Sequence, residues 1–328
     1  MRLTPAFLGL GVLLLAADSG ASQGEAEPAR PSFRVGGGAE RFGLVLPREE
    51  RLEYVARVSL AGIVVATGEV TQSCEVLPHV PSVLLPVEAD ADGPGLETAT
   101  IRMRAAGDYT LYSLDSTLEV RHFPQAWPRS IYRGFSKGSD ARRYEFMLGV
   151  REGKSTLRYQ KDTPKGAPKG TRIWKDPEWL EVPEGGVDML TAVFLCRRLV
   201  ELEVDELTFP LVDKDEVTKL TLRRSGEKRV QTEAGSFDAV EVLLLPEPWT
   251  EDGQTAGDEA NDAGDFKGLF GLKGSIHLWV EKHSGVPLVI AGDLPAGPFT
   301  LGVDVRLAKY SGTTAAFHPV EVALPGSR

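Results

Sequence analysis

The chain has 328 residues, of which 42% are hydrophobic and 26% are charged. This composition is ordinary for a globular protein and excludes disorder of the whole chain, because enough apolar surface is available to build a core. The formal net charge of −10 argues against nucleic acid or an anionic membrane as the main partner, since both attract cationic surfaces.

The first 21 residues predict a signal peptide. A positive charge at Arg2 precedes an apolar run over residues 6–17, and Ser19 and Ala21 supply the small-x-small pattern of a cleavage site after Ala21. The run is too short for a membrane anchor, which needs about 20 residues. The first cysteine is Cys74, so the cysteine that a lipoprotein signal requires is missing. We expect an exported protein of the periplasm or cell envelope that is not a lipoprotein and has no transmembrane segment in its mature chain.

A leader and a series of short strands follow. Residues 22–38 are small, polar and rich in glycine and proline, which predicts a flexible leader. Hydrophobic residues then alternate with polar ones over residues 53–60, 100–106 and 142–148. Such alternation predicts a sheet with one dry face and one wet face. In the last segment it separates Tyr144, Phe146 and Leu148 from Arg143, Glu145 and Met147.

The C-terminal half repeats this pattern in seven segments separated by Gly, Pro, Asp and Ser: 206–212, 216–224, 228–233, 237–245, 275–281, 286–292 and 300–310. Gly235 predicts a hairpin turn between two of them. Polar excursions interrupt the pattern at 87–97, 161–172 and 251–265, and the last should be a mobile insertion. The fold we predict is all-β: one domain over residues 39–328, a large antiparallel β-barrel or strongly curved half-barrel with one amphipathic helix packed against it.

Residues 188–201 predict that helix. At 100° per residue, Cys196 lies on a broad apolar arc, whereas Arg197 and Arg198 fall on the opposite side. Asp188 suits the positive end of the helix dipole, and the two arginines suit the negative end. The helix is too short to span a membrane. We expect it to lie across the sheet with its arginines outside the core.

The two cysteines, Cys74 and Cys196, permit one disulfide in an exported protein. The sequence does not supply the geometry that such a bond requires and leaves the pairing open. Because burial raises a thiol pKa and makes the thiol inert, we interpret Cys196 as a core residue rather than a nucleophile.

Several stretches stand in a distinctive order along the chain: the strand pair 50–70, the helix from Asp188 to Arg198, the hairpin from Ala234 to Phe237, and a tryptophan strand at Trp279 followed by a proline strand at Pro287. This order resembles the bacterial envelope family of domain of unknown function 3108 (DUF3108). The resemblance covers residues 48–312 and leaves 251–265 as an insertion. It implies an exported, β-rich protein with a curved antiparallel sheet or barrel, and it offers no catalytic residues to carry over.

Two motifs resemble catalytic or metal-binding patterns but lack the secondary structure that such sites require. Ser136 occupies the nucleophile position of a G-x-S-x-G pattern, but no strand-to-helix turn of a parallel sheet surrounds it, so a simple turn is the better interpretation. His277, Glu281 and His283 would share one face of an unbroken strand and could hold a zinc-type ion. The sequence after Glu281 predicts a turn that removes His283 from that strand.

No catalytic, cofactor or metal site is therefore predicted. The acidic stretches 90–93 and 258–265 lack the complete ligand loop of a calcium site. The basic stretch 151–175 is the candidate contact region for a lipid phosphate or an acidic partner, and its candidate contacts are Lys161, Lys165, Lys169 and Arg172. The alternative is a solvated hairpin and loop, because glycine and proline interrupt the stretch.

We expect a non-enzymatic envelope protein that binds a lipid or another hydrophobic ligand within its curved sheet, because barrels of this size can enclose a cavity. The alternative is a structural or interaction module for another envelope protein, which would use edge strands or loops. An enzyme is the third hypothesis. A ligand binder should contain an apolar cavity with a mouth, whereas an interaction module should have a filled core and an exposed apolar patch.

Overall fold

The computed structural model describes residues 33–34, 44, 46–47, 49–78, 97–109, 112–123, 129–137, 142–161, 178–214, 216–249, 268–296 and 298–312. The signal peptide at 1–21, both acidic stretches and nearly all of the leader lie outside these residues. The boundaries of the domain and of the insertion at 251–265 therefore stay predictions from the sequence.

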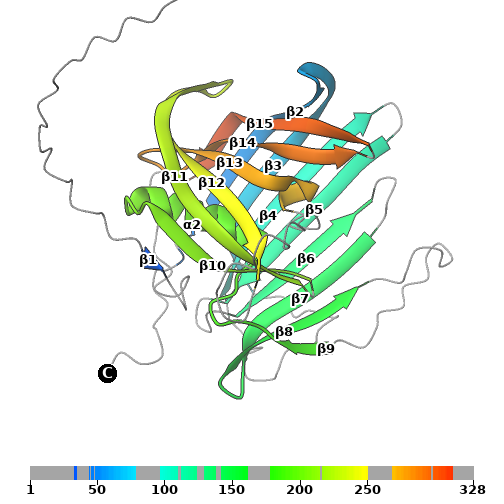
Figure 1. Ribbon diagram of the computed structural model, residues 1–328, viewed down its shortest axis with the longest axis vertical. Coiled ribbons are helices and arrows are strands. Elements are labelled where there is room, and N and C mark those ends of the chain that lie inside the picture. The colour runs from blue at the N-terminus through cyan, green and yellow to red at the C-terminus, as the bar shows by residue number, and fades with distance from the viewer. Residues whose placement is uncertain are drawn as a thin grey trace, which may run out of the picture. The chain divides into compact units, whose positions relative to one another are not determined.

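The described residues form fifteen strands in one sheet (Figure 1). The strands before the helix are β1 (Phe33–Arg34), β2 (Glu49–Leu60), β3 (Ile63–Pro78), β4 (Glu97–Tyr109), β5 (Tyr112–His122), β6 (Ser130–Ser136), β7 (Arg142–Arg151), β8 (Lys154–Lys161) and β9 (Glu178–Glu181). The strands after it are β10 (Glu206–Asp213), β11 (Glu216–Thr232), β12 (Gly235–Pro248), β13 (Lys273–Glu281), β14 (Pro287–Ala296) and β15 (Phe299–Gly312). Helix α2 (Met189–Glu201) and the 3-10 turn η4 (Leu269–Gly271) complete the described elements.

The strand order is β1-β10-β11-β12-β13-β14-β15-β2-β3-β4-β5-β6-β7-β8-β9. β1 pairs with β10 in parallel, through Leu207 and Thr208, and the other neighbours are antiparallel. The chain runs through β2 to β9, passes through α2 to the far side of the sheet, and returns through β10 to β15, which pairs with β2. The sheet is curved and not closed, so the predicted all-β antiparallel half-barrel with one helix is confirmed.

Alternation along the strands sets the two faces of the sheet. In β4, Ile101 and Met103 are buried, whereas Arg102 and Arg104 are exposed, as predicted. In β7 the prediction of one wet face is wrong, because Glu145 and Met147 are buried as well. Met147 belongs to a second apolar cluster on the outer face, with Phe123, Ile131 and Trp179.

Helix α2 fills the inner face, defined here as the face of the sheet that packs on α2. It begins after Asp188, whose carboxylate accepts a hydrogen bond from the Thr191 N–H and caps the helix. It contacts β5 on one side and β10 and β13 on the other, so the sheet wraps around it. The prediction that Arg197 lies outside the core is wrong, since its side chain is only 2% exposed. Because strands pack on α2 from several sides, the polar face of the helix at Arg197 is also covered by protein and not by solvent.

Antiparallel connectivity places alternate hairpins at opposite ends of the sheet. The β2–β3 hairpin, at the top of Figure 1, lies at the same end of the sheet as the β4–β5 and β14–β15 hairpins, at its upper right. The β7–β8 hairpin lies at the other end, at the bottom. The β2–β3 turn consists of Ala61 and Gly62, which both have positive φ angles of 49° and 82°, as a two-residue type I′ turn requires. Below the turn the register of the hairpin shifts between Val58 and Ser59, which leaves Val65 as an extra residue on β3.

Candidate functional site

The strongest polar contact inside the sheet ties α2 to β2. Both nitrogens at the end of the Arg197 guanidinium donate hydrogen bonds to Glu50, at 2.7 and 2.8 Å from its two carboxylate oxygens. Glu50 lies on the inner face of β2, because Leu52, Tyr54 and Ala56 follow it there at the same period. Complete burial makes this bidentate pair an anchor for the helix rather than a site open to a ligand.

A second buried chain of polar groups fixes the start of α2. The Thr191 hydroxyl donates to Asp188 Oδ2 at 2.6 Å and lies 3.0 Å from His122 Nε2 of β5. Burial lowers the pKa of His122 to about 3, so its imidazole is neutral near pH 7. Burial also raises the pKa of Asp188, although hydrogen bonds from Thr191 oppose the shift. The three side chains resemble a catalytic triad in type, but the hydroxyl stands between acid and imidazole and the group is enclosed in the core.

Both cysteines are buried and free, so the structure has no bond between them. Burial raises the thiol pKa of Cys196, and burial followed by the nearby Glu50 carboxylate raises that of Cys74. The Cys74 thiol donates to the Pro47 carbonyl oxygen at 3.3 Å. The interpretation of Cys196 as a core residue is confirmed by its full burial within the main apolar cluster. Neither thiol has the exposure that nucleophilic chemistry needs.

Aromatic rings line the inner face of β6 and β7. The Tyr132 ring stacks on Phe146 with centroids 4.7 Å apart, and Tyr144 stacks beside it at 6.0 Å. The Lys214 ammonium lies 5.0 Å from the centre of the Tyr144 ring, within cation–π range. Burial raises the pKa of both tyrosines, so neither hydroxyl ionises near neutral pH. These rings extend the packed core up to the β10–β11 turn.

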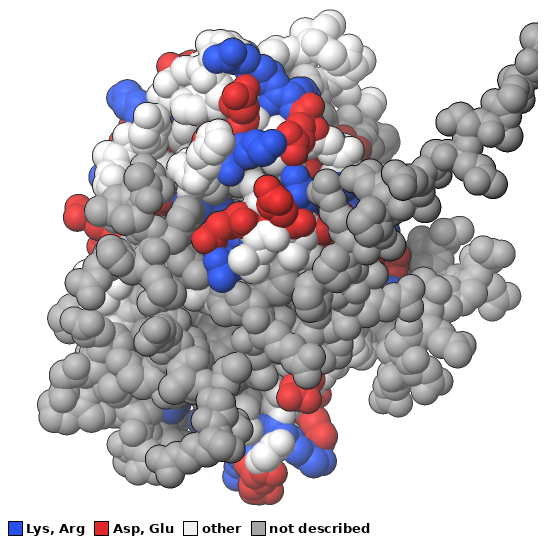
Figure 2. Space-filling model, turned by 90° about the vertical axis from the view of Figure 1, so that its left-hand side faces the viewer, with Lys and Arg blue, Asp and Glu red and all other residues white. Residues whose placement is uncertain are grey.

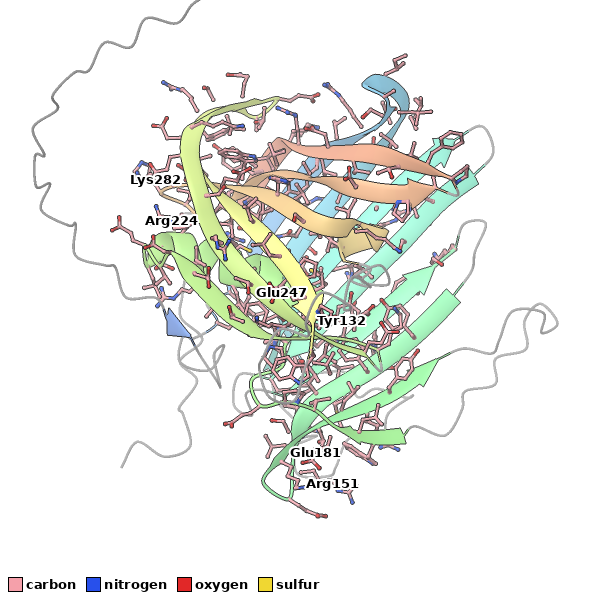
Figure 3. All side chains as sticks on the ribbon, in the orientation of Figure 1. Tyr132, Arg151, Glu181, Arg224, Glu247 and Lys282 are labelled. Carbon is pink, nitrogen blue, oxygen red and sulfur yellow. The ribbon has the colours of Figure 1, made fainter. Side chains whose placement is uncertain are left out.

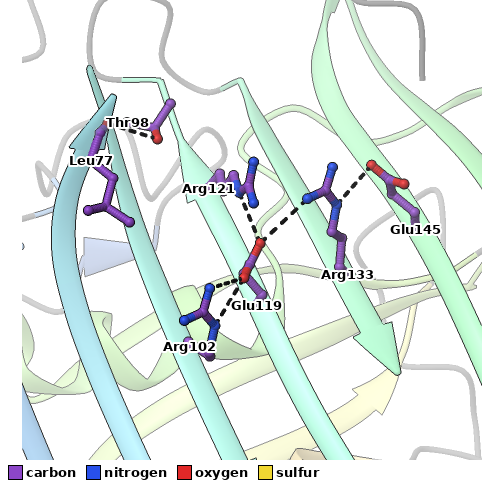
Figure 4. A network of polar contacts seen from close by, with 7 residues as sticks. All are labelled: Leu77, Thr98, Arg102, Glu119, Arg121, Arg133 and Glu145. Carbon is purple, nitrogen blue, oxygen red and sulfur yellow. Dashed lines mark hydrogen bonds and ion pairs between the residues drawn. The ribbon is translucent and has the colours of Figure 1, made fainter. Parts of the chain in front are cut away.

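An arginine–glutamate network crosses the outer face of β4 to β7 (Figure 4). The Glu119 carboxylate accepts hydrogen bonds from Arg102 at 2.6 and 3.0 Å and from Arg121 at 2.9 Å. Arg133 joins it to Glu145, to which it donates at 3.2 Å. Burial works against the charge of Glu119, but the arginines outweigh it and lower the pKa of this carboxyl. A carboxylate surrounded in this way cross-links strands and has no proton to give near pH 7.

Charges alternate in sign on the opposite side of the molecule. Figure 2 shows Lys and Arg interleaved with Asp and Glu on the part of that face drawn in colour, which lies on the left of Figure 1. Arg224 and Lys282, labelled in Figure 3, both pair with Glu227, at 3.0 and 2.7 Å. Opposite charges neutralise each other here, so this part of the surface does not select an ionic partner by its net sign.

The apolar surface that stands out is the tip of the β2–β3 hairpin, residues 59–68, which we call the finger. Its sequence, SLAGIVVATG, contains no charge. β15 accompanies β2 only as far as Ser59, and β4 accompanies β3 only from Glu69 onward. The finger therefore extends past the last residues that pair with either neighbouring strand. It is held by pairing of its own two arms, with Leu60 opposite Ile63.

Branched side chains of the finger are open to solvent. Ile63 is 70% exposed, Val64 52% and Val65 55%, and Leu60 is exposed too. Phe299, at the start of β15 and at the same end of the sheet, is also exposed. The matching two-residue hairpin at the other end, β7–β8, has the charged residues Arg151, Glu152 and Lys154 at its tip instead. Exposed apolar residues gathered at one hairpin mark a contact surface.

Sequence reasoning did not find the finger, although residues 53–60 were predicted to be a strand. The signal was present: alternation stops at three consecutive apolar residues, Ile63 to Val65, directly after an Ala-Gly turn. Such a run predicts a strand buried on both faces. Only the exposed fractions of Ile63, Val64 and Val65 in the folded chain reveal that no other described segment covers them.

The predicted chemical motifs are not assembled into a site. Ser136 ends β6 within the antiparallel sheet, without the turn into a helix that a nucleophile elbow has. His277 faces Glu241, with Nδ1 2.9 Å from its carboxylate, whereas Glu281 accepts the backbone N–H of His283. His283 lies in the turn after β13, as predicted. In the described ranges no three potential metal-ligating side chains converge.

The basic candidate contacts lie almost wholly outside the described residues. Lys161 is the last residue of β8, and Lys165, Lys169 and Arg172 follow in the segment that the structure does not describe. Their role as contacts to a ligand or partner stays a prediction. As for membrane-crossing helices, the described ranges contain none with the necessary length and apolar character.

A family model described as "Protein of unknown function (DUF3108)" matches residues 97–304. The chain belongs to the DUF3108 family. The match contains α2, the β11–β12 hairpin and the strands of Trp279 and Pro287, which are the landmarks that suggested the resemblance. The strand pair 50–70, and with it the finger, precedes the matched DUF3108 span. No curated protein matches the chain.

Proposed function

We propose that the protein is an exported, non-enzymatic component of the bacterial cell envelope that engages an apolar partner through the finger. The observation that carries this proposal is the exposed, charge-free surface of Ile63, Val64 and Val65. Covering one such side chain fully is worth about 1.5–3 kcal/mol. A partner that covers all three therefore gains enough free energy to offset part of the entropy lost on association.

Packing of the inner face favours this interaction role over an enclosed ligand. α2 occupies the inner face. Phe194 on one side of the helix and Leu195 and Leu199 on another are each at most 1% exposed. A ligand held deep within the sheet would have to compete with these side chains for the same space. A filled core together with an exposed apolar patch is the combination expected of an interaction module.

Secretion and fractionation in a bacterial host test the proposal. We expect the full chain to reach the periplasm or envelope with Ser22 as its new N-terminus, measured by mass spectrometry of the intact protein. We expect its association with envelope material to fall at least tenfold in Ile63→Ser/Val64→Ser, by the loss of buried apolar area. The control is Val150→Ser, an equally exposed valine (58%) at the opposite end of the sheet, which should associate as the wild type does.

Two results would contradict the proposal. Retention of the uncleaved chain in the cytoplasm would remove the exported role. A stoichiometric hydrophobic ligand, found by native mass spectrometry and organic extraction and unaffected by the finger substitutions, would favour binding within the sheet instead.

A further inference from the structure

We propose that the finger inserts into the acyl layer of a phospholipid membrane surface and that Arg57 binds a lipid phosphate at its base. This inference rests on the proposed function and deepens it, because it names a lipid surface as the apolar partner.

The finger is apolar on both faces of its ribbon. Leu60 and Ile63 are opposite each other in register and share one face. Val64 is opposite Ser59, so it points to the other face, because successive residues of a strand alternate. A protein groove covers one face of a docked hairpin and leaves the other in water. An acyl layer surrounds both faces, which matches a ribbon with exposed branched side chains on each.

Arg57 supplies a charge at the base of the finger. It is exposed, and it forms no ion pair or hydrogen bond with the described part of the chain. Asp304, its register partner in β15, is engaged by Arg306 at 2.6 and 3.0 Å. The Arg57 guanidinium is therefore available for an external anion, and a planar fork of donors suits a phosphate.

Charge and length place these groups at matching depths. Four residues separate Arg57 from Ala61 in the turn, which is about 13 Å at a rise of about 3.3 Å per residue. One leaflet of the hydrocarbon core is about 15 Å thick, half of the bilayer value of about 30 Å. With Arg57 at the phosphates, the charge-free tip ends inside one leaflet. The two arms pair with each other there, except at the register shift that leaves Val65 without a register partner.

The net charge of −10 makes insertion, rather than attraction to anionic lipid, the driving contribution. Adhesion by surface charge needs clusters of lysine and arginine, whereas the finger has no charge and a single free arginine, Arg57, lies at its base. Binding should therefore occur on zwitterionic membranes and depend weakly on salt.

The decisive experiment uses large unilamellar vesicles of phosphatidylcholine and a polarity-sensitive fluorophore on Val64→Cys. Labelling is selective, because the native thiols of Cys74 and Cys196 are buried. We expect the emission to shift to the blue when vesicles are added, whereas the same label on Val150→Cys stays in water. An unchanged spectrum at position 64 would overturn the inference.

Vesicle flotation measures the energetics. We expect Ile63→Ser/Val64→Ser to lower the vesicle partition coefficient roughly a hundredfold, from the loss of two branched side chains, and Val150→Ser to leave it unchanged. Arg57→Gln should lower partition onto phosphatidylcholine severalfold but leave binding to micelles of an uncharged detergent as it is. Circular dichroism should be the same for all variants, because the substituted side chains lie outside the core. Equal partition of wild type and the finger variant would contradict the inference.

The failure of this inference can be told apart from failure of the proposed function. A photoreactive residue at position 64 that gives a discrete adduct with an envelope protein, without any vesicle binding, would overturn the lipid partner and keep the finger as an interaction site. Finger-dependent dimers in solution would do the same. Absence of vesicle binding together with an envelope association that the finger substitutions do not alter would overturn both.

Discussion

A single arginine of α2 joins the helix to β2 inside the core. Arg197 and Glu50 come from elements 147 positions apart and form a buried, bidentate pair. Removing one member of such a pair costs about 3–5 kcal/mol, because the other charge is left buried without a partner. We expect Arg197→Met to lower the free energy of unfolding by about this amount, measured by urea denaturation.

The neighbouring arginine provides the control. Arg198 is partly exposed and pairs with Glu201 at 2.7 Å within the same helix, so Arg198→Met should cost less than about 1 kcal/mol. Replacing both buried partners, Glu50→Leu with Arg197→Met, should restore much of the stability. Equal losses from Arg197→Met and Arg198→Met would show that the buried pair does not anchor the helix.

His122 links stability to pH. Its folded pKa of about 3 lies below the unfolded value of about 6.5, so between these values the unfolded chain binds the extra proton. The free energy of unfolding should therefore fall by about 1.4 kcal/mol for each pH unit below about 6.5. From pH 7 to pH 5 the wild type should lose about 2 kcal/mol more than His122→Gln, measured by urea denaturation at both pH values.

Asp188 changes stability in the opposite direction, because its raised pKa makes the folded state bind the extra proton as pH falls. Wild type and His122→Gln both retain Asp188, so the comparison isolates the imidazole. A slope that survives in His122→Gln would show that the buried imidazole is not its source.

At the scale of elements, the fit of β6 against β7 depends on a glycine. Gly134 is opposite Tyr144, and a Cβ built on it would lie 2.3 Å from the tyrosine ring. We expect Gly134→Ala to lower the free energy of unfolding by about 1–3 kcal/mol, because the ring must move out of its stack with Tyr132. Thermal unfolding followed by circular dichroism measures the loss.

Gly149 of the adjacent strand tests whether the effect is specific. The nearest side-chain atom to its built Cβ is 4.0 Å away, so Gly149→Ala should be neutral or slightly stabilising. The double variant Gly134→Ala/Tyr144→Leu should lose less free energy of unfolding than the sum of the two single variants. The reason is that Tyr144→Leu removes the ring with which the new Cβ at position 134 would clash. Strict additivity would contradict the proposed clash.

The same scale explains which strands were predictable. β4 shows the alternation predicted from its sequence, with Ile101 on the inner face and Arg102 on the outer face. Successive side chains of a strand point to opposite faces, and along this part of β4 only the inner face is covered. The segments 216–224 and 228–233 were predicted separately and join into the long strand β11, with a register shift between Arg224 and Gly226. A bulge absorbs the extra residue there without ending the strand, and sequence patterns do not distinguish it from a turn.

At the scale of the whole molecule, α2 connects two arrays of hairpins. β9 is one edge of the sheet, and β10 lies beside the short parallel strand β1 near the other. The helix lies between the two arrays and packs on members of both, β5 and β13. This arrangement fills the inner face. The exposed apolar side chains of the finger lie outside it, at the end of the sheet, and the proposed interaction is therefore assigned to that end.

Local periodicity and composition determined most of the strand pattern, the helix with its acidic N-terminus and the antiparallel fold class, because these depend on neighbours in the chain. The order of landmark segments along the chain carried the resemblance to DUF3108. Tertiary structure decided that Arg197 is buried, that Met147 has apolar cover and that residues 59–68 have none. Those outcomes depend on which distant strand lies opposite a residue and on where that strand ends. The pairing of Glu50 with Arg197 is a relation between distant segments that no local pattern contains. The same holds for the pairing with β15 and β4, which stops at Ser59 and at Glu69.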